Sequence, residues 1–291
     1  MIKYETVLRM RSLFIMDKRM KNKRFRQYWR RYCMRINFTQ KIKKLKWGIS
    51  YSVWDCEELL EESIRSVRAA ADYIQVVWQE ISWRGTKTSG NLYSLLKKLE
   101  KDGLIDELVK FEPDINDKPW HNELKKRNIG LMMLKKRGVD YFMTMDADEF
   151  YDADQLNEVK YQILEKKLTH VYSPITTYFS PTKQIILPGY FVNIWSKIYF
   201  FSKLGHNLHA PCLCDPTREI LHIPFARYWV QEGITMHHFS FLRKNIMSKW
   251  TETSASKQYK IFVDNSTLYK NLPYAVVPDK FNLGSLVKEW K

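Results

Sequence analysis

Short apolar runs alternate with amphipathic helical stretches from Trp47 onward, and this alternation constrains the fold more than any other feature. Four runs are typical of strands: residues 47–54, 73–78, 108–111 and 139–145. A series of strands separated by helices predicts an α/β fold, Rossmann-like, with a mainly parallel central sheet and helices on its faces.

Three helices are expected between these strands. The first carries an apolar stripe of Leu60, Ile64, Val67 and Ala71, and the second a stripe of Leu92, Leu95, Leu96 and Leu99 that stops at Gly103. The third, 119–136, has Pro at its start and Gly138 after its end, which are common helix boundary signals.

Acidic residues follow each of the four predicted strands. Ligands of parallel α/β sheets bind beyond the carboxyl ends of the strands, so these residues are the first candidates for chemistry. They are Asp55, Glu80, Asp114 and the run Asp146-Ala147-Asp148-Glu149.

Asp146 and Asp148 directly follow the buried fourth strand. If the extended backbone continues, their side chains point to the same side, because side chains alternate along a strand. Two carboxylates so placed can hold a hard divalent cation, with the diphosphate of a nucleotide as a further ligand. The alternative is an acidic surface turn.

The sequence at this point resembles a glycosyltransferase of the GT-A fold, close to the family-2 type. The resemblance covers roughly residues 47–250 and rests on three segments: Lys126-Arg127-Asn128-Ile129-Gly130, Asp146-Ala147-Asp148-Glu149-Phe150-Tyr151, and Met236-His237-His238-Phe239-Ser240-Phe241-Leu242-Arg243-Lys244. It implies transfer of a sugar from a nucleotide-diphosphate donor, with a UDP-sugar favoured, to a hydroxyl on a glycan, lipid-linked or protein acceptor.

The resemblance also implies roles for individual residues. Asp146 and Asp148 would bind Mn²⁺ or Mg²⁺ bridging the donor diphosphate, with His238, or less favourably His237, completing the metal site. Arg127 and Asn128 would face the diphosphate or its metal. The base and ribose would lie against Trp54, Asp55, Gln79 and Glu80.

Simpler interpretations stand beside these. Arg127 has Glu123 one helical turn before it and could pair with that residue alone. Adjacent His237 and His238 would face opposite ways in a strand, so at most one can reach the site. The second strand also lacks the acidic pair typical of the family, which leaves the base preference open.

The family-2 resemblance suggests inversion at the anomeric carbon, which requires a carboxylate base on the acceptor side. Asp215 is the first candidate and Glu219 the second. Asp215 before Pro216 could equally open a turn, and Glu219 could pair with Arg218. Among the aromatic residues of 178–201, Tyr190 and Trp195 are the expected acceptor contacts, whereas most of the others should be core.

The positive charge is concentrated at the N-terminus. The chain carries a formal net charge of +16, of which residues 1–46 supply 16 − 2 = +14 and the rest 32 − 30 = +2. Aromatic and apolar residues of 25–36 recur at helical spacing among arginines, which predicts a basic amphipathic helix. We expect it to bind an anionic membrane surface, with packing on its own domain second and nucleic acid third. A transit peptide also has such an Arg-rich, acid-poor composition.

These patterns predict an N-terminal arm, 1–46, and a catalytic domain, 47–291. The domain would comprise a nucleotide-binding half (47–152), an acceptor half (153–250) and a C-terminal extension (251–291). The longest apolar stretch, Ile129–Leu134, is too short to span a membrane. The four cysteines are sparse, and no signal region precedes the two Asn-X-Thr sequons. We therefore expect a cytoplasmic protein, peripheral at a membrane.

Two other functions compete with a glycosyltransferase. A metal-dependent nucleotidyltransferase could use the same two carboxylates, although the sequence has no GxxxxGK phosphate loop. A protein that binds nucleic acid or a membrane surface could act through the basic arm alone.

Overall fold

The computed structural model describes residues 44–185, 189–207, 210–221, 225–243 and 277–283, together with positions 35, 39–42 and 252. The chain divides into two units, Met1–Lys44 and Leu45–Lys291. The predicted amphipathic helix of the arm, 25–36, lies outside the described residues except for position 35. No described helix is both long and apolar enough to cross a membrane.

The second unit begins with four strands separated by three helices, as predicted. The strands are β1 (Trp47–Val53), β2 (Tyr73–Trp78), β3 (Glu107–Lys110) and β4 (Tyr141–Asp146). The helices are α3 (Glu57–Arg68), α4 (Leu92–Lys101) and α5 (Pro119–Lys136). The bounds of β2 and α5 are those expected from the sequence, and Gly103 and Gly138 beyond α4 and α5 have positive φ values of 73° and 70°.

The later elements complete one sheet. They are β5 (Glu149–Phe150), α6 (Ala153–Lys166), β6 (His170–Ser180), β7 (Lys183–Ile185), β8 (Tyr190–Lys197), β9 (Leu213–Cys214), β10 (Tyr228–Val230), β11 (Met236–His238) and the 3₁₀ turn η1 (Asp279–Phe281). Among the described residues the sheet runs β3-β2-β1-β4-β8-β6-β11-β5, with β7 and β10 on β6 and β9 on β8.

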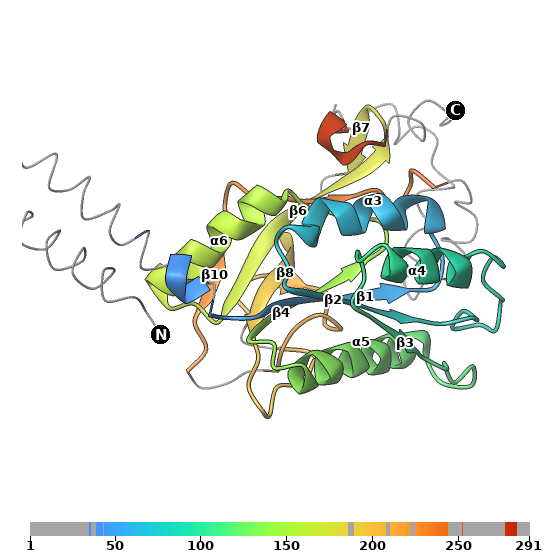
Figure 1. Ribbon diagram of the computed structural model, residues 1–291, viewed down its shortest axis with the longest axis horizontal. Helices are drawn as coiled ribbons and strands as arrows, with labels where there is room; N and C mark the ends of the chain where they lie inside the picture. The colour runs from blue at the N-terminus through green and yellow to red at the C-terminus, as the bar shows by residue number, and fades with distance from the viewer. Residues whose placement is uncertain are drawn as a thin grey trace, which may run out of the picture. The chain divides into compact units, whose positions relative to one another are not determined.

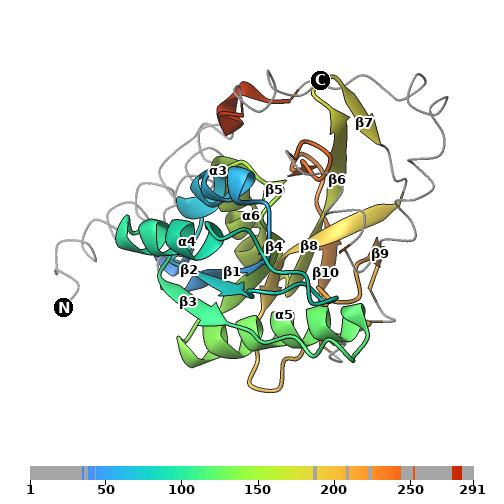
Figure 2. The ribbon, with the colours of Figure 1, turned by 90° about the vertical axis from the view of Figure 1, so that its right-hand side faces the viewer.

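Most strand pairs of the sheet are parallel, and the four antiparallel pairs all involve later strands. Helices α3, α4 and α6 cover one face, and α5 covers the other (Figures 1 and 2). The predicted Rossmann-like α/β architecture with a mainly parallel sheet is therefore confirmed.

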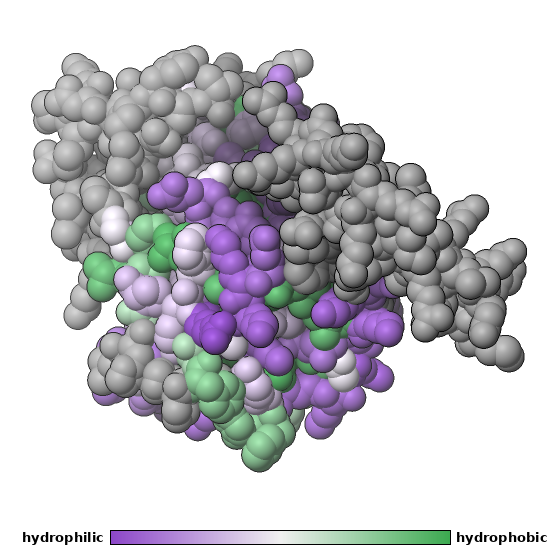
Figure 3. Space-filling model, turned by 90° about the vertical axis from the view of Figure 1, so that its left-hand side faces the viewer, coloured by the Kyte–Doolittle hydropathy of each residue, from purple (hydrophilic) through white to green (hydrophobic). Residues whose placement is uncertain are grey.

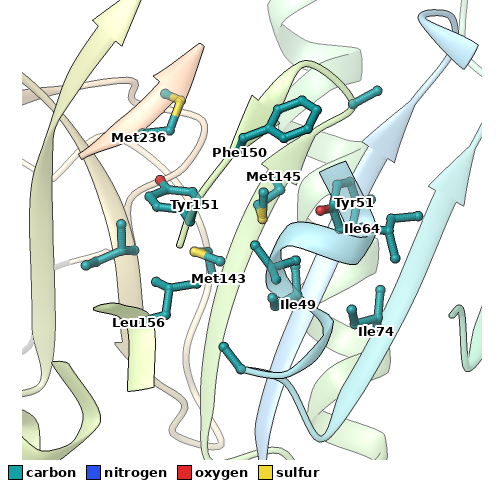
Figure 4. Packing of buried hydrophobic residues seen from close by; sticks show 14 of the residues in the cluster. Ile49, Tyr51, Ile64, Ile74, Met143, Met145, Phe150, Tyr151, Leu156 and Met236 are labelled. Atoms are coloured by element: carbon teal, nitrogen blue, oxygen red, sulfur yellow. The ribbon is translucent and has the colours of Figure 1, made fainter. Parts of the chain in front are cut away.

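Two packed regions fix the orientation of α5 and the centre of the sheet. A Cβ at Gly130 would lie 2.1 Å from Ser50 Oγ, so this glycine allows α5 to approach β1 closely. On the opposite face, Ile49, Tyr51, Met143 and Met145 alternate into the core (Figure 4). Burial of such side chains contributes roughly 1.5–3 kcal/mol each, which holds the strand ends in place.

Candidate functional site

The order of strands in the sheet reverses between β1 and β4. Strands β2 and β3 extend the sheet on one side of β1, and β4 pairs in parallel on its other side, with Ser52 opposite Asp146. A crevice at such a reversal, beyond the carboxyl ends of the strands, is the usual ligand site of open α/β sheets. Here that position carries Asp55 after β1 and Asp146 at the end of β4.

Asp146 lies between two buried arginines. Arg127 Nη2 donates to both carboxylate oxygens of Asp146, at 3.1 and 3.0 Å, and Arg218 Nη2 donates to Oδ2 at 2.5 Å. Arg127 also donates to Glu123 and to Thr144 Oγ1, each at 2.9 Å. The Asp146 side chain is nevertheless 30% exposed, whereas that of Arg127 is 1% exposed. The carboxylate is thus fixed in orientation but open to solvent.

The two aspartates do not continue along one extended strand, and this prediction is wrong. Strand β4 ends at Asp146, Ala147 and Asp148 form a turn, and β5 begins at Glu149. Asp148 is fully buried, and its Oδ2 accepts from Ser240 Oγ at 2.9 Å and from Arg243 Nη2 at 2.5 Å. The turn therefore separates the surroundings of the two carboxylates.

Arg243 joins the ends of β1 and β4 through their carboxylates. Its Nη1 lies 3.0 Å from each oxygen of Asp55, and its Nη2 contacts Asp148. Burial alone would lower the pKa of the guanidinium, but Asp148 and Asp55 beside it raise the pKa well above its usual value. Asp55 is thereby held at the reversal point, with its side chain 25% exposed.

Glu149 is, like Asp148, a buried carboxylate of this region. It is buried, pairs with Arg218 through both carboxylate oxygens, and accepts from the Asp146 backbone N–H at 3.0 Å. Burial raises the pKa of Glu149, and the Arg218 guanidinium acts against that rise. Glu149 thus positions Asp146 both through the backbone and through Arg218. We call Asp55, Asp146, Asp148, Glu149 and their three arginines the strand-end cluster.

His238 reaches the strand-end cluster and His237 does not. His238 Nε2 lies 3.7 Å from Asp148 Oδ1 and contacts Ser240 Oγ. His237 Nδ1 lies 2.9 Å from Tyr178 Oη on the other side of β11, and burial lowers its pKa to about 4. The prediction that only one of the two histidines can face the site is confirmed.

The expected base-and-ribose residues divide into two groups. Trp54 and Asp55 follow β1 at the reversal point, and buried Gln79 after β2 accepts from Lys126 Nζ at 2.9 Å. Lys126 also donates to Val53 O at 2.8 Å, and burial lowers its pKa to about 7. Glu80 is exposed and pairs with Lys110 at 3.1 Å. Trp54, Asp55 and Gln79 therefore lie at the end of β1 or contact Lys126 of α5, whereas Glu80 faces solvent.

Asn128 has a role that differs from the predicted one. Its Oδ1 accepts from Leu204 N at 2.9 Å and its Nδ2 donates to Leu204 O at 3.2 Å. This pair of bonds ties the loop after β8 to α5, which explains a poor helix former in mid-helix. The structure therefore contradicts Asn128 as a diphosphate ligand. Asp114 likewise bonds Asn122 through its backbone instead of joining the cluster.

The two candidate bases are placed differently. Asp215 Oδ2 lies 3.5 Å from Arg218 Nε, and the Asp215 side chain is 31% exposed. Its Oδ1 accepts from Thr217 N and Oγ1, both at 2.8 Å. Glu219 is 2% exposed and accepts from Asn207 N at 3.0 Å, and burial raises its pKa to about 7. Asp215 alone presents a carboxylate to solvent beside the strand-end cluster.

Of the two expected acceptor contacts, one is wrong. Trp195 has no exposed surface and packs edge-on against Trp47, whose ring stacks on Tyr141 with centroids 4.6 Å apart. It belongs to the core because it points inward from the middle of β8. Tyr190 begins β8 and is half-buried, so it stays a candidate.

Within the strand-end cluster, Asp146 has the carboxylate most exposed to a divalent cation. Within the described residues no three His, Cys, Asp or Glu side chains gather as metal ligands. Mg²⁺ and similar ions, however, often take one or two carboxylates and complete their shell with water and substrate phosphates. The open carboxylate of Asp146 fits that role, whereas Asp148 is enclosed by Ser240, Arg243 and His238.

No family model and no curated protein matches this sequence. Among solved structures, S. aureus TarS is similar over 48% of this chain and 25% of its own, with 14% identity and a TM-score of 0.33. S. aureus TarS 1–349 in complex with UDP-GlcNAc is similar over 48% of this chain and 39% of its own, with 14% identity and a TM-score of 0.34. GalNAc-T7 with UDP, GalNAc and Mn²⁺ is similar over 46% of this chain and 23% of its own, with 14% identity and a TM-score of 0.34. This chain thus spans less than half the length of each.

Proposed function

We propose that this protein is a glycosyltransferase that moves a sugar from a nucleotide-diphosphate donor to a hydroxyl. The observation that carries the proposal is the strand-end cluster at the reversal point between β1 and β4. Carboxylates and arginines are brought there from β4, β5, α5 and the segments around 218 and 243, and the open carboxylate of Asp146 faces solvent. So many buried charges, held by mutual hydrogen bonds, are more costly than a structural role requires.

The donor nucleotide would lie along the carboxyl ends of β1 and β2. Asp55, fixed by two bonds from Arg243, has oxygens suited to ribose hydroxyls, and Trp54 beside it offers an aromatic face. Gln79 would not bind the donor with its amide oxygen, because that oxygen already accepts a hydrogen bond from Lys126. It would help to shape the site from its place after β2. A UDP-sugar is the favoured donor on the sequence resemblance.

The departing diphosphate would be stabilised by fixed positive charge. Arg127 and Arg218 are held beside Asp146 before any ligand binds, and charges fixed in advance stabilise a developing anion most effectively. Mn²⁺ or Mg²⁺, held by Asp146 and the donor phosphates, would supply Lewis-acid stabilisation of the leaving group. Asp148 and His238 would then position the turn that follows Asp146.

Asp215 is the proposed general base for an inverting transfer. Its partly exposed carboxylate lies beside Arg218, and Arg218 in turn donates a hydrogen bond to Asp146. A carboxylate in this position could take the proton of an acceptor hydroxyl while the diphosphate leaves from the other side of the sugar. The acceptor, a glycan, lipid-linked or protein hydroxyl, would contact Tyr190. The basic arm would hold the enzyme at an anionic membrane surface.

A thermal-shift panel tests this proposal. UDP, GDP, CMP and their sugars would be added with and without Mn²⁺ to the wild type, to Asp146→Asn and to Asp154→Asn. Asp154 is an exposed carboxylate in the first turn of α6 and serves as the matched control. A nucleotide at one hundred times its Kd should raise the Tm by about 5–10 °C.

One nucleotide should give this shift in the wild type and in Asp154→Asn, and Asp146→Asn should lose it. A shift that is equal in all three proteins would remove the strand-end cluster from the donor site. If no nucleotide or nucleotide sugar shifts the wild type, the glycosyltransferase proposal fails, and the basic arm becomes the region to study.

A further inference from the structure

Aromatic rings of the loop that follows β8, and of Phe225 shortly before β10, are exposed to solvent. Phe200 is 89% exposed, Phe225 is 55% exposed and Phe201 is 46% exposed. They surround Tyr199, whose ring stacks on Phe201 with centroids 5.6 Å apart and meets Phe225 edge-on at 5.2 Å. We call Tyr199, Phe200, Phe201 and Phe225 the aromatic loop cluster. Soluble surfaces seldom expose this much contiguous aromatic area without a contact to make.

The loop is held in shape by contacts to α5. Lys135 Nζ donates to Phe200 O at 2.6 Å and to Ser202 O at 3.1 Å, and Ser202 Oγ accepts from Tyr199 N at 2.8 Å. Asn128 fixes the loop again at Leu204. The rings of Phe200 and Phe201 are therefore presented by a loop that is fixed through hydrogen bonds to α5.

Three lysines border the aromatic loop cluster. Lys197 Nζ lies 5.4 Å from the Tyr199 ring centroid, Lys135 bonds the loop backbone, and Lys203 is exposed next to Ser202. Within the described parts of the chain none of these lysines pairs with a carboxylate. Rings flanked by uncompensated lysines match the boundary of an anionic bilayer, where rings enter the headgroup region and ammonium groups meet lipid phosphates.

The shape of this region favours a bilayer over a second copy of the chain. The loop, gold in Figure 1, projects at the lower edge of the molecule, and apolar atoms gather at that edge in Figure 3. A symmetric dimer through this surface would place the same lysines opposite one another, which is unfavourable. A projecting loop that carries a ring as exposed as that of Phe200 inserts more readily into a soft interface than into a rigid protein surface.

We propose that the aromatic loop cluster is a membrane-insertion site of the folded body, separate from the basic arm. It would bind bilayers that contain anionic lipids by placing Phe200, Phe201 and Phe225 among the headgroups. The proposal does not depend on the glycosyltransferase activity.

Flotation of the full chain with vesicles tests the proposal. The vesicles would contain phosphatidylcholine and phosphatidylglycerol at 70:30, and binding would be measured at 0.1 and 0.5 M NaCl. High salt screens the charges of the basic arm but leaves ring insertion nearly unchanged. We expect Phe200→Ser/Phe201→Ser/Phe225→Ser to reduce the partition coefficient at least about tenfold at 0.5 M NaCl.

Two matched variants complete the experiment. Tyr93→Ser/Ile115→Ser removes apolar residues of similar exposure, 53% and 55%, on other segments and should change binding less than twofold. Lys197→Gln/Lys203→Gln should weaken binding several-fold at 0.1 M NaCl and little at 0.5 M. The Tm of each variant shows that it is folded, and Phe200→Ser alone, which removes the most exposed ring of the cluster, should still reduce binding about threefold.

Three results would overturn the inference. The wild type could fail to bind vesicles at 0.5 M NaCl, or the triple variant could bind within twofold of the wild type there. The third is a triple variant that abolishes self-association in sedimentation equilibrium while vesicle binding is retained, which would make the surface a contact between two copies.

Discussion

The strand-end cluster and the aromatic loop cluster lie on the same folded body, but one buries charged side chains and the other exposes apolar ones. In the first, charged groups are buried and each arginine is held by carboxylates, as Arg218 is by Asp146 and Glu149. In the second, apolar rings are exposed, and the lysines that border them have no carboxylate partner among the described residues. Buried charge needs its partners to be stable, whereas exposed rings cost the fold little. The first arrangement fixes a geometry, and the second provides a surface.

Substitution of Asp146 should have the largest effect. Asp146→Asn should lower the turnover of the nucleotide sugar at least about 1000-fold, because it removes the open carboxylate of the site. Stability should change little, since Arg127 keeps Glu123 and Arg218 keeps Glu149 as partners. Release of the nucleoside diphosphate, measured beside the Tm, separates the two effects. Activity within tenfold of the wild type would contradict the proposed site.

Removal of Arg243 should lower the stability of the protein. Arg243→Met leaves the fully buried Asp148 and the partly buried Asp55 without their shared guanidinium, which should cost about 3–5 kcal/mol of unfolding free energy. Urea denaturation measures this loss. Arg65→Met, which breaks only the surface pair with Glu61, is the control and should cost less than about 1 kcal/mol.

A double variant sharpens the second prediction. Adding Asp148→Asn to Arg243→Met removes the buried charge and should recover part of the lost stability. If the double variant is as unstable as the sum of the two single variants, Arg243 acts by packing and not by pairing.

Lys126 should make stability depend on pH. Its pKa is lowered by burial to about 7, so between about pH 7 and 10.5 the unfolded chain binds a proton that the folded chain releases. Stability conferred by this site therefore rises with pH, by at most about 1.4 kcal/mol per pH unit. Urea denaturation from pH 7 to 9 should show this rise in the wild type relative to Lys126→Met. Parallel pH profiles of the two proteins would mean that Lys126 stays charged in the fold.

Substitution within the aromatic loop cluster should have the smallest effect on stability. Phe200→Ser removes a ring that is 89% exposed and should change the unfolding free energy by less than about 0.5 kcal/mol. Trp195→Ala, in the core, should cost about 3–5 kcal/mol under the same conditions. Equal losses for the two variants would mean that the rings of the loop are structural after all.

The sequence predicted the nucleotide-binding half well because its signals are local. The boundary signals of α5, a proline at its first position and Gly138 just after its end, are short-range features, and β2 is a compact apolar run. The positions of Asp55 and Asp146 after predicted strands indicated the strand-end cluster, and the family resemblance pointed to Arg127 within it and to His238 beside it. It expected a pair of aligned aspartates, but the turn at Ala147 and Asp148 separates them.

The rest of the site depends on contacts between distant segments. Arg218 meets Asp146 across 72 positions, and Arg243 meets Asp55 across 188, so no spacing in the sequence indicates these pairs. Glu149 was noted only as part of the acidic run, and its pairing could have been expected, since a carboxylate that starts a buried strand needs a partner. Trp195 was misplaced because an aromatic residue in a strand has the same pattern whether it faces the core or a ligand.

Photoaffinity labelling tests the central claim, that the donor binds at the carboxyl ends of β1 and β4, most directly. An azido derivative of the nucleotide selected by the thermal-shift panel would be cross-linked to the full chain, and the labelled peptides mapped by mass spectrometry. We expect labelling of peptides that contain Trp54 and Asp55 or Gln79 and Glu80, lost when the unmodified nucleotide is in excess. Competed labelling elsewhere, for example in the groove of about 630 Å³ on α5 lined by Phe111, Leu124 and Met132, would contradict the claim.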